Sequence, residues 1–394
     1  MKSQSEISLN VAAYVIELLE DGKRTATYKL ALLTALLDLA MQAPAVPQQS
    51  AVSIRTIDIA HCVIGCYWPH TLIYKKTGHI LIQNSHKDED SINLGGSGIV
   101  RKVADFRLAL RNAMNGREPS FADAVGSSLY RSLLREIETI LVKMPIPKLQ
   151  VLPGGTVPRL YVMGWQQNDS SVNLGNSVDF ESGISQSLSL KQRLPDRFIQ
   201  LLPGVLTAFQ SLNVLLRSYI QNCWVDQVVS LNKATLQDSD VSSVGEFLFS
   251  RTRVSTQVLQ QPLMTLQKSR CFYCGGQIKK EPEVDHFIPW SRIPDDGLHN
   301  LVAAHADCNR SKSNLLPSLE HLDVWLTRNV DQEDEIRERI HEINVSWIFD
   351  PKRAANTAYN TYSQLPQDYN LWHGKESGSK FDPSDFERRI LSRF

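Results

Sequence analysis

The stretch that decides the fold runs from Cys271 to Pro317 and reads CFYCGGQIKKEPEVDHFIPWSRIPDDGLHNLVAAHADCNRSKSNLLP. It opens with a CxxC pair, Cys271 and Cys274, and after 30 intervening residues carries an HxxC pair, His305 and Cys308. Together the pairs offer three thiolates and one imidazole, the closed tetrahedral ligand set of structural zinc. The alternative is a redox-active CxxC beside a packed HxxC pair, but the surrounding sequence lacks the pattern of a redox fold. The spacing therefore predicts a structural Zn²⁺ site.

Four polar residues lie between and just after these pairs. Asp285 and His286 end an expected strand that begins near Glu283, Asn300 opens the apolar run NLVAA, and Asn309 begins an expected helix. A fold that joins the two pairs also brings these four residues close together. The carboxylate and the amides offer oxygen ligands to a hard divalent cation, and an imidazole can take a proton from water. This is the inventory for hydrolysing a phosphodiester.

The segment resembles an HNH (ββα-metal) nuclease domain of the zinc-stapled kind found in McrA-like endonucleases. A longer phrase that continues to EHLDVW also resembles bacterial HNH proteins with a helical region before the nuclease. Two positions depart from the usual pattern: His305 stands where many relatives have cysteine, and Asn309 stands where the family's final histidine falls. The motifs that carry the resemblance are CxxC, DH-x-x-P (Asp285, His286, Pro289), NL (Asn300, Leu301) and CN-x-x-K (Cys308, Asn309, Lys312).

The resemblance implies a role for each polar residue. His286 would be the general base that activates water. Asp285 and Asn309 would bind a catalytic Mg²⁺ or Mn²⁺ that stabilises developing charge. Asn300 would orient the base by holding the imidazole through its other nitrogen.

Nucleic-acid contacts must come from local clusters, because 42 basic residues balance 42 acidic ones. Residues 251–280 contain basic residues and no Asp or Glu, so Lys268 and Arg270 are candidate phosphate contacts, with a solvated linker as the alternative. The resemblance adds Arg310 and Lys312 as candidates. A second basic set is expected to form a solvated helix face: Arg101, Lys102, Arg107 and Arg111.

The whole chain is expected to be an α+β protein of three parts. Residues 1–250 form a mostly helical targeting or sensing region of one or two subdomains, residues 251–330 form the zinc-stapled ββα-metal HNH domain, and residues 331–394 form a helical tail that packs back or binds a partner. Periodicity predicts helices at 7–24, 27–42 and 204–232, strands at 79–83 and 157–163, and a Ser/Asn/Gly-rich loop at 165–190.

Several other residues favour structural roles. His299 is expected in a surface or loop position between the two strands. The group His61, Cys62, Cys66 and His70 is better explained by a buried helix than by a second metal site. The run NLGGSG at 93–98 reads as a plain turn. The tryptophans expected to pack in the core or at hinges are Trp224, Trp290 and Trp325, with Trp290 wedging the loop after the strand that carries His286.

Composition places the protein among ordinary globular chains, with 42% hydrophobic and 21% charged residues. The N-terminal sequence lacks a secretory signal, and the apolar stretch at 28–41 is too short and too polar to span a bilayer. Six cysteines form no regular disulfide framework. A cytoplasmic protein without membrane contact is therefore expected.

The sequence thus predicts a metal-dependent endonuclease that cuts DNA, and the resemblance alone adds a role in restriction or phage defence. Alternatives are a nuclease of RNA or single strands, an effector gated by a signal, and a non-catalytic zinc-dependent nucleic-acid-binding module. A single site cuts one strand, so double-strand cleavage would need a homodimer or two sequential events.

Overall fold

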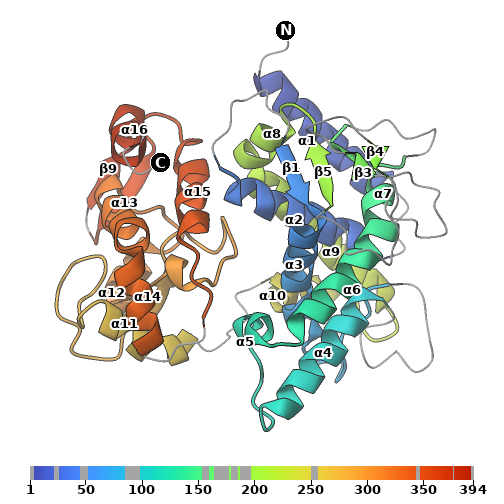
Figure 1. The fold of residues 1–394 in the computed structure, drawn as a ribbon, viewed down its shortest axis with the longest axis horizontal. Coiled ribbons are helices and arrows are strands. Elements are labelled where there is room, and N and C mark those ends of the chain that lie inside the picture. Colours follow the sequence, from blue (N-terminus) through green and yellow to red (C-terminus); the bar gives the residue numbers. More distant parts are fainter. Residues whose placement is uncertain are drawn as a thin grey trace. The chain divides into compact units, whose positions relative to one another are not determined.

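In the computed structural model, the chain forms two compact units (Figure 1). Unit 1 comprises Met1–Ala40 and Val46–Thr252, and unit 2 comprises Met41–Ala45 and Arg253–Phe394. The structure describes residues 4–21, 26–44, 52–84, 98–152, 159–163, 177–178, 185–186, 197–249, 256–342, 347–375 and 377–391.

Unit 1 consists mainly of helices, among which α3 and α6 lie side by side (Figure 1). Its α-helices are α1 (Gln4–Glu20), α2 (Tyr28–Gln42, of which residues to Ala40 belong to this unit), α3 (Thr56–Tyr67), α4 (Ile99–Ala113), α5 (Phe121–Gly126), α6 (Tyr130–Lys143), α7 (Pro145–Leu149), α8 (Val205–Ser211), α9 (Asn213–Leu231) and α10 (Val241–Phe249). Short 3₁₀ turns are η1 (Pro69–Thr71) and η3 (Asp238–Asp240). Its strands are β1 (Val52–Arg55), β2 (Tyr161–Met163), β3 (Ser177–Val178), β4 (Ser185–Gln186) and β5 (Phe198–Leu201).

The main sheet of unit 1 is antiparallel, with β5 between β1 and β2. Leu201 pairs with Val52 on one side and with Tyr161 on the other. The strand expected at 157–163 is confirmed over its last three residues, which form β2, and 157–158 lie outside the described residues. The strand expected at 79–83 is wrong, because this stretch forms isolated bridges, such as that from His79 to Tyr74, and no strand.

The core of unit 1 explains the apolar helices. In α2, Leu30 through Leu37 are buried on nearly every side, as expected for a helix that is apolar all round. The helix expected at 204–232 is divided at Leu212 into α8 and α9. Trp224 of α9 is fully buried, confirming its core role, and its indole donates a hydrogen bond to Gln83 at 2.8 Å.

The basic face expected on α4 is only partly correct. Arg101, Lys102 and Arg111 are at least partly exposed and pair with nearby carboxylates. Arg107 is buried instead, and its guanidinium donates to the carbonyl of Trp68 at 2.6 Å. A guanidinium has enough donors to bond a buried backbone carbonyl and also keep a charged partner. Periodicity alone therefore did not reveal that Arg107 is buried.

The two histidines of the group on α3 and η1 pack against aromatic residues, as expected for structural roles. His61 contacts Tyr130, and His70 is buried against Trp224. Within the described ranges, the single group with metal-ligand geometry lies in unit 2. The run at 93–98, except Gly98, and most of the loop at 165–190 lie outside the described residues.

Unit 2 contains two separate two-stranded antiparallel sheets among helices. Its strands are β6 (Glu283–His286), β7 (Leu301–Ala304), β8 (Asn370–Gly374) and β9 (Ser377–Lys380). Its α-helices are α11 (Gln260–Leu266), α12 (Ala306–Lys312), α13 (Leu319–Leu326), α14 (Glu333–Glu342), α15 (Pro351–Tyr362) and α16 (Pro383–Leu391). Shorter helical turns are η4 (Thr256–Leu259), η5 (Leu298–Asn300) and the π-helical η6 (Thr327–Asp331).

The core of unit 2 draws on both ends of its sequence. Phe287, directly after β6, stacks on Trp325 of α13 with ring centroids 4.7 Å apart, so Trp325 is a core residue as expected. Tyr362, Phe386 and other apolar residues after 330 join the same buried cluster. The β8–β9 hairpin lies in the stretch 331–394, which was expected to be a helical tail.

None of the described helices is both long and apolar enough to cross a membrane.

Acidification is expected to weaken unit 1 through His70. Burial lowers the pKa of His70 to about 4 from its ordinary 6.5, while Nε2 lies 3.1 Å from the Leu248 carbonyl. The unfolded chain therefore binds the proton more readily, and stability present above pH 6.5 is lost as the pH falls toward 4, by up to about 3 kcal/mol. Denaturation of the wild type and of His70→Gln across this window should show a shallower pH dependence for the variant. Parallel curves would contradict the assignment.

Candidate functional site

The two cysteine-containing pairs meet in unit 2. One ligand atom from each of Cys271, Cys274, His305 and Cys308 lies within 4.8 Å of all the others. Sulfurs around a tetrahedral Zn²⁺ are separated by roughly 3.8 Å, given Zn–S bonds of about 2.3 Å. The donor set and its spacing therefore fit a metal such as zinc.

Local backbone geometry forms this cluster. Gly275 adopts φ +66°, which permits the tight turn in which its N–H donates to the Cys271 carbonyl at 2.9 Å. His305 is the N-cap residue of α12, directly after β7. Its Nε2 lies 3.3 Å from the Gln277 carbonyl, and its Nδ1 lies 3.3 Å from the Cys274 sulfur. A proton on Nε2 would leave the Nδ1 lone pair for a metal.

The electrostatics of the cluster also fit a cation. Burial and the neighbouring Cys271 and Cys274 raise the pKa of Cys308 to about 12. Burial opposes ionisation of Cys274 too, but hydrogen bonds from Gly276 and His305 lower its pKa overall. A bound divalent ion would offset the repulsion among three thiolates.

The strands β6 and β7 and the helix α12 carry the predicted polar residues. The register pairs Glu283 with Ala304 and His286 with Leu301, which confirms the strand expected from Glu283 to His286. Asn300 precedes β7, and Asn309 lies within α12. The hairpin and the helix after it thus present all four residues from one small substructure.

Asp285 lies in a largely buried polar cluster. Its Oδ2 accepts a hydrogen bond from the Tyr273 hydroxyl at 2.5 Å and lies 2.9 Å from the Lys312 ammonium. Burial, and then Asp285, raise the pKa of Tyr273 well above its usual value, so the phenol remains a donor. The second carboxylate oxygen, Oδ1, makes neither of these contacts.

The four candidate phosphate contacts differ in exposure. Lys268, Arg270 and Arg310 are exposed; Arg270 donates to the Gly275 carbonyl and Arg310 pairs with Asp307. The expectation for Lys312 is corrected, because its side chain is fully buried and donates to the His286 carbonyl at 2.8 Å. A buried lysine requires a charged partner. The Lys312 ammonium therefore contacts groups inside the protein.

Asn300 does not hold the imidazole as expected. Its side chain accepts a hydrogen bond from the Ile288 N–H at 2.9 Å and donates to the carbonyls of Ile288 and Asp295 at 3.1 Å each. His286 is instead bonded through Nε2 to Asp296 Oδ1 at 2.8 Å, and its ring packs against Trp290. Asn300 therefore fixes the backbone of the loop, and an acidic residue holds the ring.

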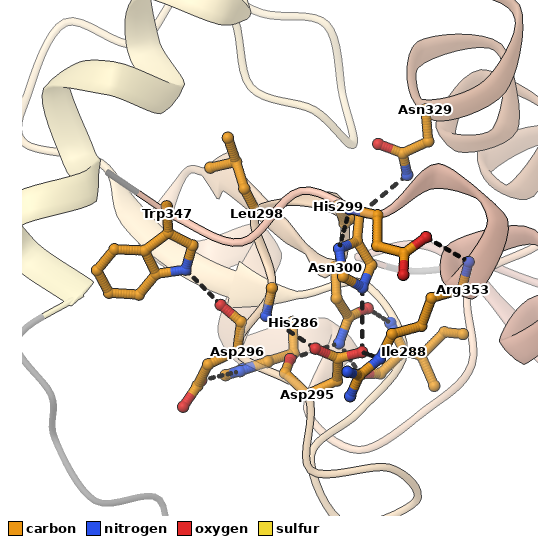
Figure 2. A network of polar contacts seen from close by, with 12 residues as sticks. His286, Ile288, Asp295, Asp296, Leu298, His299, Asn300, Asn329, Trp347 and Arg353 are labelled. Carbon is orange, nitrogen blue, oxygen red and sulfur yellow. Dashed lines mark hydrogen bonds and ion pairs between the residues drawn. The ribbon is translucent and has the colours of Figure 1, made fainter. Parts of the chain in front are cut away.

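His299 is also placed differently from the expectation. It is buried, with 1% of its surface exposed, and Nε2 lies 3.0 Å from Asp295 Oδ2 (Figure 2). Burial disfavours the Asp295 carboxylate, but Arg353 and His299 together hold its pKa well below the usual range. The histidine is thus part of a buried ionic network.

Glu283 is a site residue that the sequence reasoning missed. Its Oε2 accepts a hydrogen bond from Asn309 Nδ2 at 2.8 Å. A carboxylate can only accept in this contact, so the amide nitrogen faces Glu283 and the amide oxygen Oδ1 faces away. The two-residue spacing from Asp285 in a strand was the available signal, because it places both acids on one face.

Comparisons with known proteins identify two regions. A family model described as an HNH endonuclease matches residues 271–318, and another, described as a domain of unknown function (DUF8808), matches residues 10–149. No curated protein and no solved structure matches the chain. The chain therefore carries an HNH endonuclease domain, with a Cys₃His cluster inside it, and such a domain implies a nucleic-acid substrate.

Loss of a cluster ligand is expected to release metal and destabilise unit 2. Cys308→Ser should abolish stoichiometric zinc binding, measured by elemental mass spectrometry, and lower the thermal midpoint by about 10 °C, since a lost ligand costs several kcal/mol. The control is Cys223→Ser in α9, which should leave both values unchanged. A wild-type protein reconstituted with zinc yet binding none would contradict the prediction.

Proposed function

We propose that the chain is a metal-dependent HNH endonuclease of the ββα-metal type that hydrolyses phosphodiester bonds in DNA. The observation that carries the proposal is the placement of His286, Asp285 and Asn309 on one hairpin and its following helix, within the region that the HNH model matches. Structural zinc at the Cys₃His cluster would hold the ends of this substructure together.

The residues present fit a catalytic divalent cation. Tyr273 and Lys312 contact Oδ2 of Asp285, and Glu283 accepts from the amide nitrogen of Asn309. Asp285 Oδ1 and Asn309 Oδ1 are therefore the oxygen atoms that we propose as ligands. These two residues would hold Mg²⁺ or Mn²⁺, which supplies stabilisation of charge on the phosphate and leaving oxygen.

His286 is the general base in this proposal. The imidazole takes a proton from water, and the water oxygen forms a new bond to phosphorus while the bond to the leaving oxygen breaks. The exposed side chains of Arg310, Lys268 and Arg270 contact the phosphate backbone and position the strand. Lys312 acts from the interior, holding Asp285 and the His286 backbone.

DNA is preferred over RNA on the resemblance to McrA-like enzymes, which also supports a bacterial role in restriction or phage defence. Unit 1, including the region of unknown function at 10–149, would then target or gate the nuclease. Double-strand cleavage would use a homodimer or two sequential events.

Replacing the base is expected to abolish cleavage. Purified protein with Mg²⁺ or Mn²⁺ should digest one or more of methylated phage DNA, unmethylated plasmid DNA and structured RNA. His286→Ala should lower the rate by about 10²–10⁴-fold because water loses its proton acceptor. The control His341→Ala changes an exposed histidine on α14 and should cleave normally. Undiminished cleavage by His286→Ala would reject the mechanism, and cleavage of RNA alone would reject DNA as the substrate.

The Glu283 carboxylate, which accepts a hydrogen bond from Asn309, is expected to increase the affinity for the catalytic metal. Glu283→Gln allows the Asn309 amide to turn either way, so the Mg²⁺ concentration for half-maximal cleavage should rise about 10–100-fold while the rate at saturation is largely kept. Glu281→Gln, at an exposed position two residues earlier, provides the control. An unchanged Mg²⁺ requirement would show that Glu283 does not orient the ligand.

A further inference from the structure

His286 has a partner that neither the motif nor its usual roles indicate. Its Nε2 lies 2.8 Å from Oδ1 of Asp296, ten residues further along the chain (Figure 2). Because a carboxylate accepts, this contact places the ring proton on Nε2 and leaves the lone pair on Nδ1. Within the described parts of the chain, no group hydrogen-bonds to Nδ1 of His286.

The ring is also confined by packing. His286 retains 3% of its surface, and the Trp290 ring meets it edge-on with centroids 5.3 Å apart. The Asp296 side chain is one-third exposed. The imidazole therefore has a fixed plane, and the carboxylate selects which nitrogen faces the reaction.

The loop that carries Asp296 is held from outside the matched HNH region. Trp347 donates through Nε1 to the Asp296 carbonyl at 2.5 Å (Figure 2). The Leu298 N–H donates to the Ile348 carbonyl at 2.7 Å. Both partners follow the match, which ends at residue 318. The Trp347 side chain and the Ile348 backbone therefore hold the main chain at Asp296 and at Leu298, and so fix where the Asp296 side chain begins.

A buried ionic network secures the preceding residue. Asp295 accepts from the Gly297 N–H at 2.8 Å, contacts His299, and lies 2.7 Å from Arg353 Nε. The contact between Arg353 and Asp295 is a largely buried ion pair. A Cβ built on Gly297 would lie 2.1 Å from the His299 ring, so the loop closes this tightly only with glycine.

We propose that Asp296 is a positioning residue for His286, and that the segment 347–353 sets its place. The proposal rests on the proposed nuclease function. When His286 takes the proton of water on Nδ1, the Asp296 carboxylate stabilises the resulting imidazolium and keeps the ring aimed at the water. The new bond forms between the water oxygen and phosphorus, and the bond to the leaving oxygen breaks. This is the orienting role that the resemblance assigned to Asn300.

The central test compares Asp296→Asn with Asp296→Glu in the full chain. An asparagine can offer its amide N–H to the ring and favour the other tautomer, so kcat should fall at least about 100-fold. KM, zinc content and the thermal midpoint should stay unchanged, and Asp296→Glu should recover part of the rate. The control is Asp334→Asn at an exposed position of α14. Equal rates for Asp296→Asn and the wild type, or a loss explained by unfolding, would overturn the proposal.

A second readout does not depend on cleavage. Histidine-selective ¹⁵N NMR, with the signal assigned by His286→Ala, should show the Nε2–H tautomer in the wild type and a different state in Asp296→Asn. Identical signals would overturn the positioning role even in an active enzyme. A wild type that cleaves nothing but shows the expected tautomer change would reject the nuclease function while supporting the contact.

The contribution of segment 347–353 is tested by Trp347→Phe, which keeps the ring but removes the donor to Asp296. We expect a roughly 10-fold lower kcat that adds little to the loss in Asp296→Asn, since both changes act through one contact. Fully multiplicative losses would show that Trp347 acts elsewhere.

Discussion

The antiparallel register between β6 and β7 is the constraint on which the candidate site depends. Side chains alternate between the two faces of a strand. A register slip of one residue would therefore move both Asp285 and His286 to the face opposite the one that each occupies. The register is fixed at both ends. Near Ala304, the hairpin leads into His305 and its sulfur partners, while at Leu301 it leads back to the loop of Asn300. The Cys₃His cluster and the hydrogen bonds of Asn300 therefore lie at the two ends of the same strand pairing.

Much of the site could be predicted because its signals are local. The paired cysteine motifs, the strand ending in Asp285 and His286, and the helix containing Asn309 depend on spacing, and the structure places each on the expected element. Their chemical roles remain proposals. The same locality explains why the long apolar helices of unit 1 were foreseen, whereas β1 and β5 were not, since these strands pair across more than a hundred residues.

The residues misjudged from sequence are charged or polar groups whose burial depends on distant partners. Lys312 and Arg107 resemble surface cations in any periodic pattern, yet each meets a carboxylate or carbonyl supplied by another element. His299 was expected near the surface because nothing local indicates Arg353, more than fifty residues later, as a partner of the same aspartate. Burying a charged or polar group costs free energy unless its partners are present. No short window of sequence contains all of these partners.

The stacking of Phe287 on Trp325 has a further consequence for how this module can be moved between proteins. The first ring belongs to the segment that defines the HNH domain, and the second lies beyond it, as do Tyr362 and Phe386 in the same core. A graft that ended at residue 318 would contain the motif residues but lack the apolar side chains that complete their core. The folding unit that contains the HNH domain is therefore larger than its recognisable motif, and an exchange that preserves its core must include the segment through α16.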